Sequence, residues 1–206
     1  MISSHQLRSL FLSLAGAYGF TYWWPASSPE EVILGAILAQ NTSWKNAEKA
    51  LLSLHGMSAG EIISHRHLED LIKPAGFYRQ KSGYIRNALS YYLGKIENLS
   101  LPLSAREELL TLRGIGNETA DSIALYAFHE RTVPVDSYTI RLLNRFFLKS
   151  YSLKDYESLR RLLILSFSTD ELMEFHGLVD EHAKRVCTRN PHCGECMIRE
   201  GCLGRR

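Results

Sequence analysis

The sequence predicts an all-α protein. Apolar residues recur at helical spacing along most of the chain, serine and glutamate capping patterns mark several helix starts, and no pair of alternating apolar runs indicates a β-hairpin. A chain of 206 residues can form one domain or two small lobes. On folding, a chain of this size buries roughly 70% of the surface that it exposes when unfolded, so a substantial core is expected.

Several expected helices begin at recognisable capping residues. Ser28 is followed by Pro29 and Glu31, which is the order of an N-cap, a first-turn proline and a capping-box glutamate. The Ser-x-x-Glu pattern recurs at Ser58 and Ser104. Further helices are predicted by apolar periodicity and by glycine and proline punctuation. They cover about residues 3–17, 44–55, 66–73, 80–95, 117–129, 136–148, 155–167 and 169–186.

Composition limits the classes of partner. The net charge is only +2 and the sequence pI is about 8.3, so any nucleic-acid footprint is a local patch rather than a basic tail. No signal-peptide pattern and no apolar run of membrane-spanning length is found in the sequence. We therefore expect a cytoplasmic, nucleoid-associated protein. No internal repeat or flexible linker stands out, which favours compact lobes.

The segment Leu112 to Ala120, Leu-Arg-Gly-Ile-Gly-Asn-Glu-Thr-Ala, predicts a tight turn that opens onto a helix. Gly114 and Gly116 allow positive φ angles and close backbone approach. Free amides at the following helix start, together with the helix dipole, can bind a DNA phosphate. The alternative is a glycine turn that only joins two packed helices. In the DNA-binding hypothesis the contacts come from Arg113, Gly114, Gly116, Asn117 and Thr119.

Asp136 follows the hairpin segment by sixteen residues, in Val-Pro-Val-Asp-Ser. Because it precedes a predicted helix, it can serve as an N-cap. It can equally present a carboxylate to a substrate held by the hairpin, and the two roles are compatible.

Together these segments resemble the helix-hairpin-helix and Gly/Pro-Asp signature of the endonuclease III superfamily of DNA glycosylases. Val32 to Thr42 is similar to the family's early helix ending in a glutamine that enters DNA, here Gln40. Gly76 to Lys81 is similar to its second DNA-facing loop, with Phe77 or Tyr78 as a second inserted residue. The resemblance runs from about residue 28 to residue 202.

This resemblance implies two helical lobes. Residues 28–134 are expected to form a central lobe that contains the helix-hairpin-helix motif. Residues 1–27 and 135–206 are expected to form the second lobe, which ends in a cysteine loop at 187–202, with the active cleft between the lobes. Double-stranded DNA containing a damaged base is the implied partner, and the enzyme is expected to act as a monomer.

All four cysteines lie in a C-x5-C-x2-C-x5-C array near the C-terminus: Cys187, Cys193, Cys196 and Cys202. This clustering predicts a metal site, since a reducing cytosol disfavours disulfides. Tetrahedral zinc and a four-iron four-sulfur (4Fe-4S) cluster both satisfy the ligand count. The resemblance implies the cluster, although the family's array is C-x6-C-x2-C-x5-C. Four basic residues surround the cysteines, either facing phosphates or solvent: Lys184, Arg185, Arg189 and Arg199.

The expected chemistry is removal of a base from DNA. Such an enzyme flips the nucleotide out of the duplex at a cost of a few kcal/mol. Cleavage of the N-glycosidic bond builds positive charge on the sugar, and Asp136 is the expected catalytic carboxylate that stabilises it. Bifunctional relatives carry a Schiff-base lysine where this chain has Glu118. A carboxylate cannot form an imine, so we expect no lysine-dependent lyase activity.

The tryptophans suggest the substrate. Trp23, Trp24 and Trp44 are the only three in the chain and lie within about twenty residues. They either anchor the core or form an aromatic pocket, which suits a cationic alkylated purine such as 3-methyladenine or 7-methylguanine. The chain resembles the bacterial 3-methyladenine DNA glycosylase III branch most closely. That branch implies Trp24 and Trp44 as base-stacking residues, with Lys184 near the pocket. Glu118 either contacts the DNA or the pocket, or is a first-turn glutamate favoured by the helix dipole.

Two alternatives remain open. The first is an endonuclease III-like glycosylase for oxidised pyrimidines or mismatched bases. The second is a non-catalytic helix-hairpin-helix protein that only grips the DNA backbone. Replacing Asp136 distinguishes catalysis from binding alone.

Overall fold

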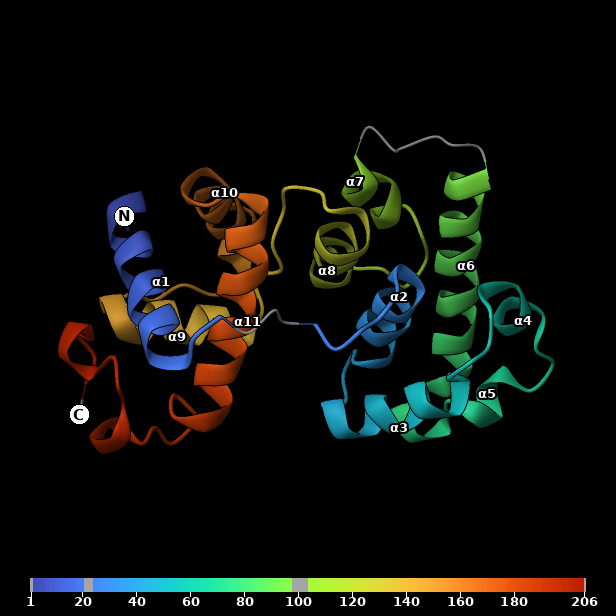
Figure 1. The fold of residues 1–206 in the computed structure, drawn as a ribbon, viewed down its shortest axis with the longest axis horizontal. Helices are drawn as coiled ribbons and strands as arrows, with labels where there is room; N and C mark the ends of the chain where they lie inside the picture. Colours follow the sequence, from blue (N-terminus) through green and yellow to red (C-terminus); the bar gives the residue numbers. More distant parts are fainter. Residues whose placement is uncertain (1, 21–23, 98–103, 206) are drawn as a thin grey trace. The chain divides into compact units, whose positions relative to one another are not determined.

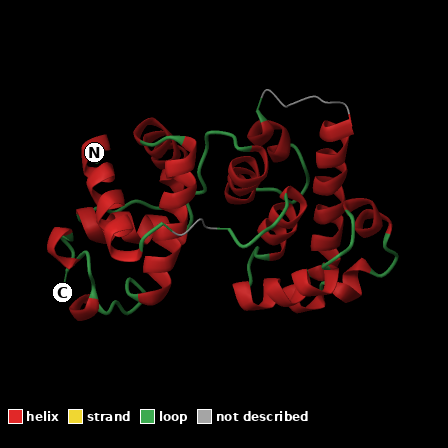
Figure 2. Cartoon of the chain, viewed as in Figure 1, coloured by secondary structure: helices red, strands yellow, loops and turns green. Residues whose placement is uncertain are grey.

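The structure, a computed structural model, describes residues 2–20, 24–97 and 104–205. These residues contain eleven α-helices and no β-strand, which confirms the predicted all-α class (Figures 1 and 2). None of the described helices is long and apolar enough to cross a membrane. The chain forms two compact units: unit 1 is Met1–Trp24 with Arg131–Arg206, and unit 2 is Pro25–Glu130.

Unit 2 is built around helix α2. All residues from Val32 to Leu38 in this helix are buried, as expected for a helix covered on every side. It packs against α3, α6 and α8 (Figure 1). The elements of unit 2 are α2 (Pro29–Leu38), α3 (Trp44–Leu54), α4 (Ala59–Ser64), α5 (Leu68–Leu71), the 3-10 turn η1 (Lys73–Ala75), α6 (Tyr78–Glu97), α7 (Ala105–Leu110) and α8 (Asn117–Phe128).

Unit 1 joins the N-terminal helix to the last helices of the chain. Helix α1 packs against α10 and α11, and α9 packs against α11. Phe167 links the layers, with ring centroids 5.5 Å from Phe11 and 5.2 Å from Phe175. The elements of unit 1 are α1 (Ser4–Tyr18), α9 (Ser137–Phe147), η2 (Leu153–Asp155), α10 (Tyr156–Ser166), α11 (Thr169–Arg185), η3 (Cys193–Glu195) and η4 (Arg199–Gly201).

The predicted capping residues begin the expected helices, although Ser28 and Ser104 accept from the N3 amide without forming the reciprocal bond of a capping box. Ser58 and Glu61 form both hydrogen bonds of a capping box. At α2, Ser28 accepts from the Glu31 amide, but the Glu31 carboxylate accepts from the amide and hydroxyl of Ser27 rather than from the Ser28 amide. Ser27 offers two donors to one oxygen, and these bonds hold the pKa of Glu31 below its usual range.

The helix predicted over about residues 66–73 is shorter than expected. Helix α5 covers Leu68–Leu71, and the 3-10 turn η1 follows at Lys73–Ala75. Pro74 explains the break because it has no backbone N–H to continue an α-helical ladder.

Candidate functional site

The turn between α7 and α8 depends on a positive φ at one of its two glycines. Gly114 has a φ of 87°, in the left-handed region, whereas Gly116 is extended with a φ of −94°. A Cβ at Gly114 would lie 2.3 Å from the ring of Tyr84 on α6. A Cβ at Gly116 would meet no atom within 4 Å. The turn therefore needs glycine at position 114 and leaves open space at position 116.

Helix α8 begins at this turn without a side-chain cap. Gly116 is the N-cap residue, so the first amides of the helix have no side-chain acceptor there. Asn117 and Glu118 are exposed, and Thr119 is buried. Uncapped amides and the positive end of the helix dipole favour an anion, and the exposed Arg113 adds a cation to the same turn.

A buried ion pair joins the two helices of the hairpin. Arg106 Nε on α7 donates to Asp121 Oδ1 on α8 over 2.8 Å, and the Asp121 side chain is fully buried. Arg106 Nη2 also donates to Asn117 Oδ1 over 3.4 Å. Removing either charge would leave the other buried and unpaired, so this pair holds the hairpin in one geometry.

Gln40 lies against the hairpin. Its Nε2 donates to Gly114 O over 3.0 Å and to Thr119 Oγ1 over 2.9 Å. These bonds tie the end of α2 to the turn between α7 and α8. Insertion of Gln40 into a duplex stays a prediction, and it requires these two hydrogen bonds to break.

Phe77 is the more exposed of the two aromatic residues predicted in the second DNA-facing loop. Its side chain is 63% exposed, and its φ of 47° lies in the left-handed region, which bulky residues rarely adopt. Tyr78 is half-buried, and the Arg79 guanidinium lies 5.8 Å from its ring centroid. The structure therefore favours Phe77 as the aromatic residue available to a ligand.

Asp136 is the N-cap of α9. Its Oδ1 accepts a hydrogen bond from the Thr139 amide over 2.7 Å, and the side chain is half-buried. The capping role expected from the sequence is therefore present. The bond fixes the orientation of the carboxylate, and a catalytic role stays a prediction.

Three residues of α11 form an electrostatic cluster with Asp136. His176, Asp180 and Lys184 are spaced four residues apart and share one helix face. Burial lowers the pKa of His176, and the charges of Asp136 and Asp180 oppose that change. Burial also raises the pKa of Asp180, and the charge of Asp136 raises it further. Lys184 lowers it, since its Nζ lies 2.6 Å from Asp180 Oδ2. Asp180 was missed in the sequence, where only its spacing from Lys184 could have indicated it.

The tryptophans fall in different parts of the chain. Trp23 lies outside the described residues, Trp24 is half-buried in unit 1, and Trp44 is the half-buried first residue of α3 in unit 2. The stacking of a base between Trp24 and Trp44 stays a prediction.

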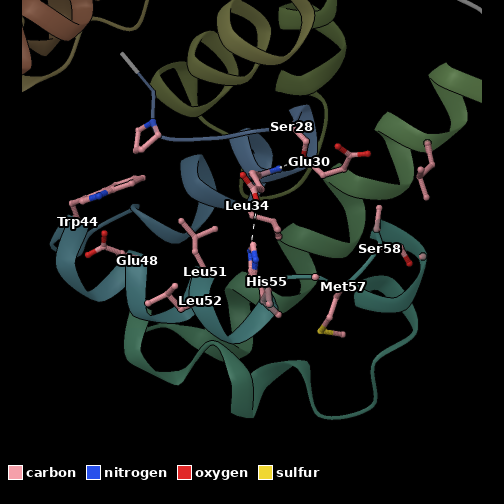
Figure 3. Close-up of a pocket in the computed structure, with 17 residues that line it drawn as sticks. Ser28, Glu30, Leu34, Trp44, Glu48, Leu51, Leu52, His55, Met57 and Ser58 are labelled. Atoms are coloured by element: carbon pink, nitrogen blue, oxygen red, sulfur yellow. Dashed lines mark hydrogen bonds and ion pairs between the residues drawn. The ribbon is translucent and has the colours of Figure 1, made fainter. Parts of the chain in front are cut away.

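Trp44 lines a pocket of about 760 Å³ within unit 2 (Figure 3). Pro25 and Glu48 line the same pocket, and Glu48 lies one helical turn after Trp44 on α3. In Figure 3 the Glu48 carboxylate lies beside the indole of Trp44, and Leu51 and Leu52 continue the wall. The pocket thus combines an aromatic face with a carboxylate, and Glu48 was not identified from the sequence.

The four cysteines surround one cavity. Cys187, Cys193, Cys196 and Cys202 line a space of about 450 Å³ at the C-terminal loop. Burial raises the pKa values of the Cys196 and Cys202 thiols, and the charges of Cys187 and Cys193 raise both further. Among the described residues, no three His, Cys, Asp or Glu side chains lie close enough to hold a single metal ion. Four cysteines around one cavity match the ligand count of both a tetrahedral zinc ion and a polynuclear iron-sulfur centre.

Helix α9 anchors both ends of the cysteine loop. Arg145 Nη1 donates to Thr188 O over 2.6 Å and to Cys187 O over 3.3 Å, and it lies 3.4 Å from Cys187 Sγ. At the other end, the Leu203 amide donates to Phe146 O over 3.0 Å and the Gly204 amide to Arg145 O over 2.9 Å. The helix that Asp136 caps therefore also holds the cysteine loop.

Comparison with known proteins identifies the family. Residues 34–166 match the family model of the HhH-GPD superfamily base excision DNA repair proteins. The chain belongs to the HhH-GPD superfamily. This HhH-GPD chain is 36% identical to MJ1434 of Methanocaldococcus jannaschii, a provisionally assigned DNA repair glycosylase, over 97% of this chain and 96% of the relative.

Solved structures share the HhH-GPD fold. A non-covalent endonuclease III–DNA complex superposes with a TM-score of 0.79 at 20% identity, covering 99% of this chain and 97% of the other. Helicobacter pylori 3-methyladenine DNA glycosylase (MagIII), bound to 1,N6-ethenoadenine, superposes with a TM-score of 0.74 at 24% identity, covering 89% and 98%. These likenesses confirm the predicted fold, and membership of HhH-GPD makes the chain a DNA glycosylase of base excision repair.

Proposed function

We propose that the protein is a monofunctional DNA glycosylase that removes cationic alkylated purines, such as 3-methyladenine and 7-methylguanine, from double-stranded DNA. The observation that carries the proposal is that both candidate residues are carboxylates, so neither offers an amine for lyase chemistry. Asp136 is held in a fixed orientation by the Thr139 amide, and Glu118 occupies the hairpin position where a Schiff-base lysine would be needed.

Asp136 supplies the negative charge that the reaction needs. When the N-glycosidic bond breaks, positive charge develops on the sugar, and a preoriented carboxylate stabilises that charge. The same carboxylate can orient water toward the sugar. Its bond to the Thr139 amide reduces the reorientation that the group needs during the reaction.

Because position 118 is a glutamate, the reaction ends once the base is released. Lyase chemistry by a lysine requires an amine that attacks the sugar carbon and forms an imine. Glu118 is exposed in the first turn of α8 and has no amine to donate. The abasic product therefore stays uncut until alkali or another enzyme cleaves it.

The pocket at Trp44 supports a cationic base. The face of an indole attracts a cation by up to about 2 kcal/mol when the pair is desolvated. Glu48 adds a negative charge on the same wall. The likeness to MagIII, which is bound to 1,N6-ethenoadenine, supports a modified purine. The likeness to endonuclease III supports the second candidate, an oxidised pyrimidine.

The four cysteines are proposed to hold a 4Fe-4S cluster. The proposal is supported by the four cysteines that line a common cavity at the C-terminal loop. Cys187, Cys193, Cys196 and Cys202 would hold the group through their thiolates, and its positive charge would offset the repulsion between them. Arg145 and the main chain of α9 hold that loop in place.

The test is release of free base from duplexes that carry defined lesions. Purified protein is incubated with methylated duplex and with oxidised-pyrimidine duplex, with and without alkali, and free base and cut strand are scored separately. We expect free 3-methyladenine and 7-methylguanine, with strand cuts only after alkali. Cuts in oxidised duplex without alkali would contradict both the substrate and the monofunctional assignment.

A further inference from the structure

Lys81 is a buried lysine for which the described part of the chain shows no acidic partner. It lies in the first turn of α6, its side chain is 1% exposed, and it is among the largest fully buried side chains of the described residues. Lysine is almost never fully buried unless its charge is satisfied. The contacts of its ammonium group therefore need an explanation beyond packing.

The ammonium joins the ends of two helical elements. Lys81 Nζ donates to Leu38 O and to Ala75 O, each over 2.8 Å. Leu38 is the last residue of α2, and Ala75 is the last residue of η1. Carbonyls at helix ends lack intrahelical partners, and a cation is favoured there. The charge is thus satisfied by main-chain oxygens from two separate segments.

Each segment leads directly into a turn with an unusual backbone. After Leu38, the turn between α2 and α3 places Asn41 at a φ of 51°. After Ala75, Gly76 has a φ of 67° and Phe77 a φ of 47°. Residues other than glycine adopt this left-handed region at an energetic cost, and such positions cluster at functional sites. The lysine therefore lies behind two turns with left-handed residues, Asn41 in one and the exposed, bulky Phe77 in the other.

The first of these turns is also tied to the hairpin. Gln40, next to Asn41, donates to Gly114 O and Thr119 Oγ1. Lys81 and Gln40 together connect three segments of unit 2: the turn after α2, the turn before α6, and the turn between α7 and α8. These are the segments that the sequence assigns to DNA contact.

We propose that Lys81 is a positioning residue whose buried ammonium fixes the turn after α2 and the turn before α6 as one rigid element for recognition of a damaged duplex. The inference rests on the proposed function, because it assigns the two turns to DNA. Lys81 touches no DNA in this scheme. It acts through the backbone carbonyls of Leu38 and Ala75.

Burial lowers the pKa of Lys81 to about 8. Burial is the sole cause of this lowered pKa. Charged groups do lie on the elements packed around α6. These groups are Glu30 and Glu31 of α2, Glu61 of α4, Glu69 and Asp70 of α5, Lys73 of η1 and Arg79 of α6 itself. Loss of the proton leaves a neutral amine that bonds the two carbonyls less strongly. The rigid element is then expected to loosen as the pH rises through about 8.

The experiment compares Lys81→Met with a matched control in the full chain. Methionine keeps the length and packing of the side chain but donates no hydrogen bond. Leu89→Ala removes a fully buried side chain two turns further along α6, so it lowers stability without touching either turn. The probes are a duplex with one tetrahydrofuran abasic-site analogue and the same duplex without damage. Amide hydrogen exchange of residues 39–43 and 76–80 is followed without DNA.

We expect Lys81→Met to lose about tenfold of the preference for the abasic duplex, the size expected for hydrogen bonds from a charged group. Its affinity for undamaged duplex, which depends on the hairpin, should change little. Both turns should exchange faster in Lys81→Met and not in Leu89→Ala. In the unmodified protein the preference should fall as the pH rises through about 8, and in Lys81→Met it should not.

Three results would each overturn the role of Lys81. The first is unchanged amide exchange of both turns in Lys81→Met, and the second is an equal loss of preference for the abasic duplex in Lys81→Met and Leu89→Ala. The third is a preference of the unmodified protein that does not change with pH. The pH profile and the exchange of the unmodified protein keep the test decisive if Lys81→Met does not fold. An unmodified protein that does not prefer the abasic duplex would instead contradict the proposed function, and the exchange measurement separates that failure from a failure of this inference.

Discussion

Tyr84 fills the space that a side chain at Gly114 would need. A Cβ at Gly114 would lie 2.3 Å from Cδ1 and Cε1 of the Tyr84 ring. Because Tyr84 comes from α6, the hairpin turn rests on the same long helix that carries Lys81. The glycine is therefore required by a contact within unit 2 as well as by its positive φ.

Gly114→Ala and Gly116→Ala form a matched pair. Gly114→Ala should lower the free energy of unfolding by about 1–3 kcal/mol, since alanine meets the Tyr84 ring at an unfavourable φ. Gly116→Ala should change it by less than about 0.5 kcal/mol, because its φ suits alanine and its space is open. Both should bind duplex DNA more weakly. Urea unfolding and duplex titration check this, and a fully stable Gly114→Ala protein would show that the turn can rearrange.

Asp136→Asn should separate catalysis from folding. Asparagine caps a helix about as well as aspartate, so the bond to the Thr139 amide and the stability of α9 should survive. The negative charge is lost, and base release should fall by about 100- to 10,000-fold. Base release from methylated duplex, duplex affinity and thermal unfolding are the measurements. Asp136→Ala serves as the control for the cap, with an added stability loss of about 1 kcal/mol. Base release retained by Asp136→Asn would refute the catalytic role.

The local signals in the sequence were sufficient for the helices and the hairpin. Ser58 and Glu61 form the capping box that their spacing predicts, and Gly114 adopts the positive φ that its turn suggested. Such features depend on residues three or four positions apart, so a single sequence contains them. The shortened helix at Leu68–Leu71 could also have been read from Pro74.

Contacts between distant residues could not be predicted in this way. Lysine is a residue type usually found at the surface, and Lys81 becomes buried only when α2, η1 and α6 pack together. The same holds for Asp180, whose electrostatic link to Asp136 joins α11 to the start of α9. Neither has a local pattern that distinguishes it from an ordinary charged residue on a helix.

Lys184→Met should destabilise the protein in a pH-dependent way. Burial raises the pKa of Asp180 above its unfolded value. The contribution of Asp180 to the free energy of unfolding is therefore greatest at low pH and falls as the pH rises through the folded pKa. Lys184 opposes that loss by stabilising the ionised carboxylate. Because Lys184 is 44% exposed, its removal should cost less than about 1 kcal/mol near neutral pH and less still in acid.

Arg185→Met is the matched control for that variant. Arg185 pairs with Glu181 at the same spacing on α11, but its side chain is 66% exposed. Its removal should have little effect at either pH. Thermal unfolding at about pH 7.5 and about pH 5 measures both variants. An equal effect of Lys184→Met at the two pH values would mean that Asp180 does not change its charge over that range.

Arg145→Met should weaken the cysteine loop without removing a ligand. The guanidinium bonds the carbonyls of Cys187 and Thr188 and approaches Cys187 Sγ, so its loss frees one end of the loop. Supporting residues of this kind typically change metal affinity by about 10- to 100-fold. We therefore expect the proposed iron-sulfur cluster to lose iron to a chelator about tenfold faster, measured by visible absorption and by iron content. Arg199→Met, on the exposed side of η4 within the array, should retain iron like the unmodified protein. Equal rates in all three proteins would show that the four cysteines hold the loop without help from α9.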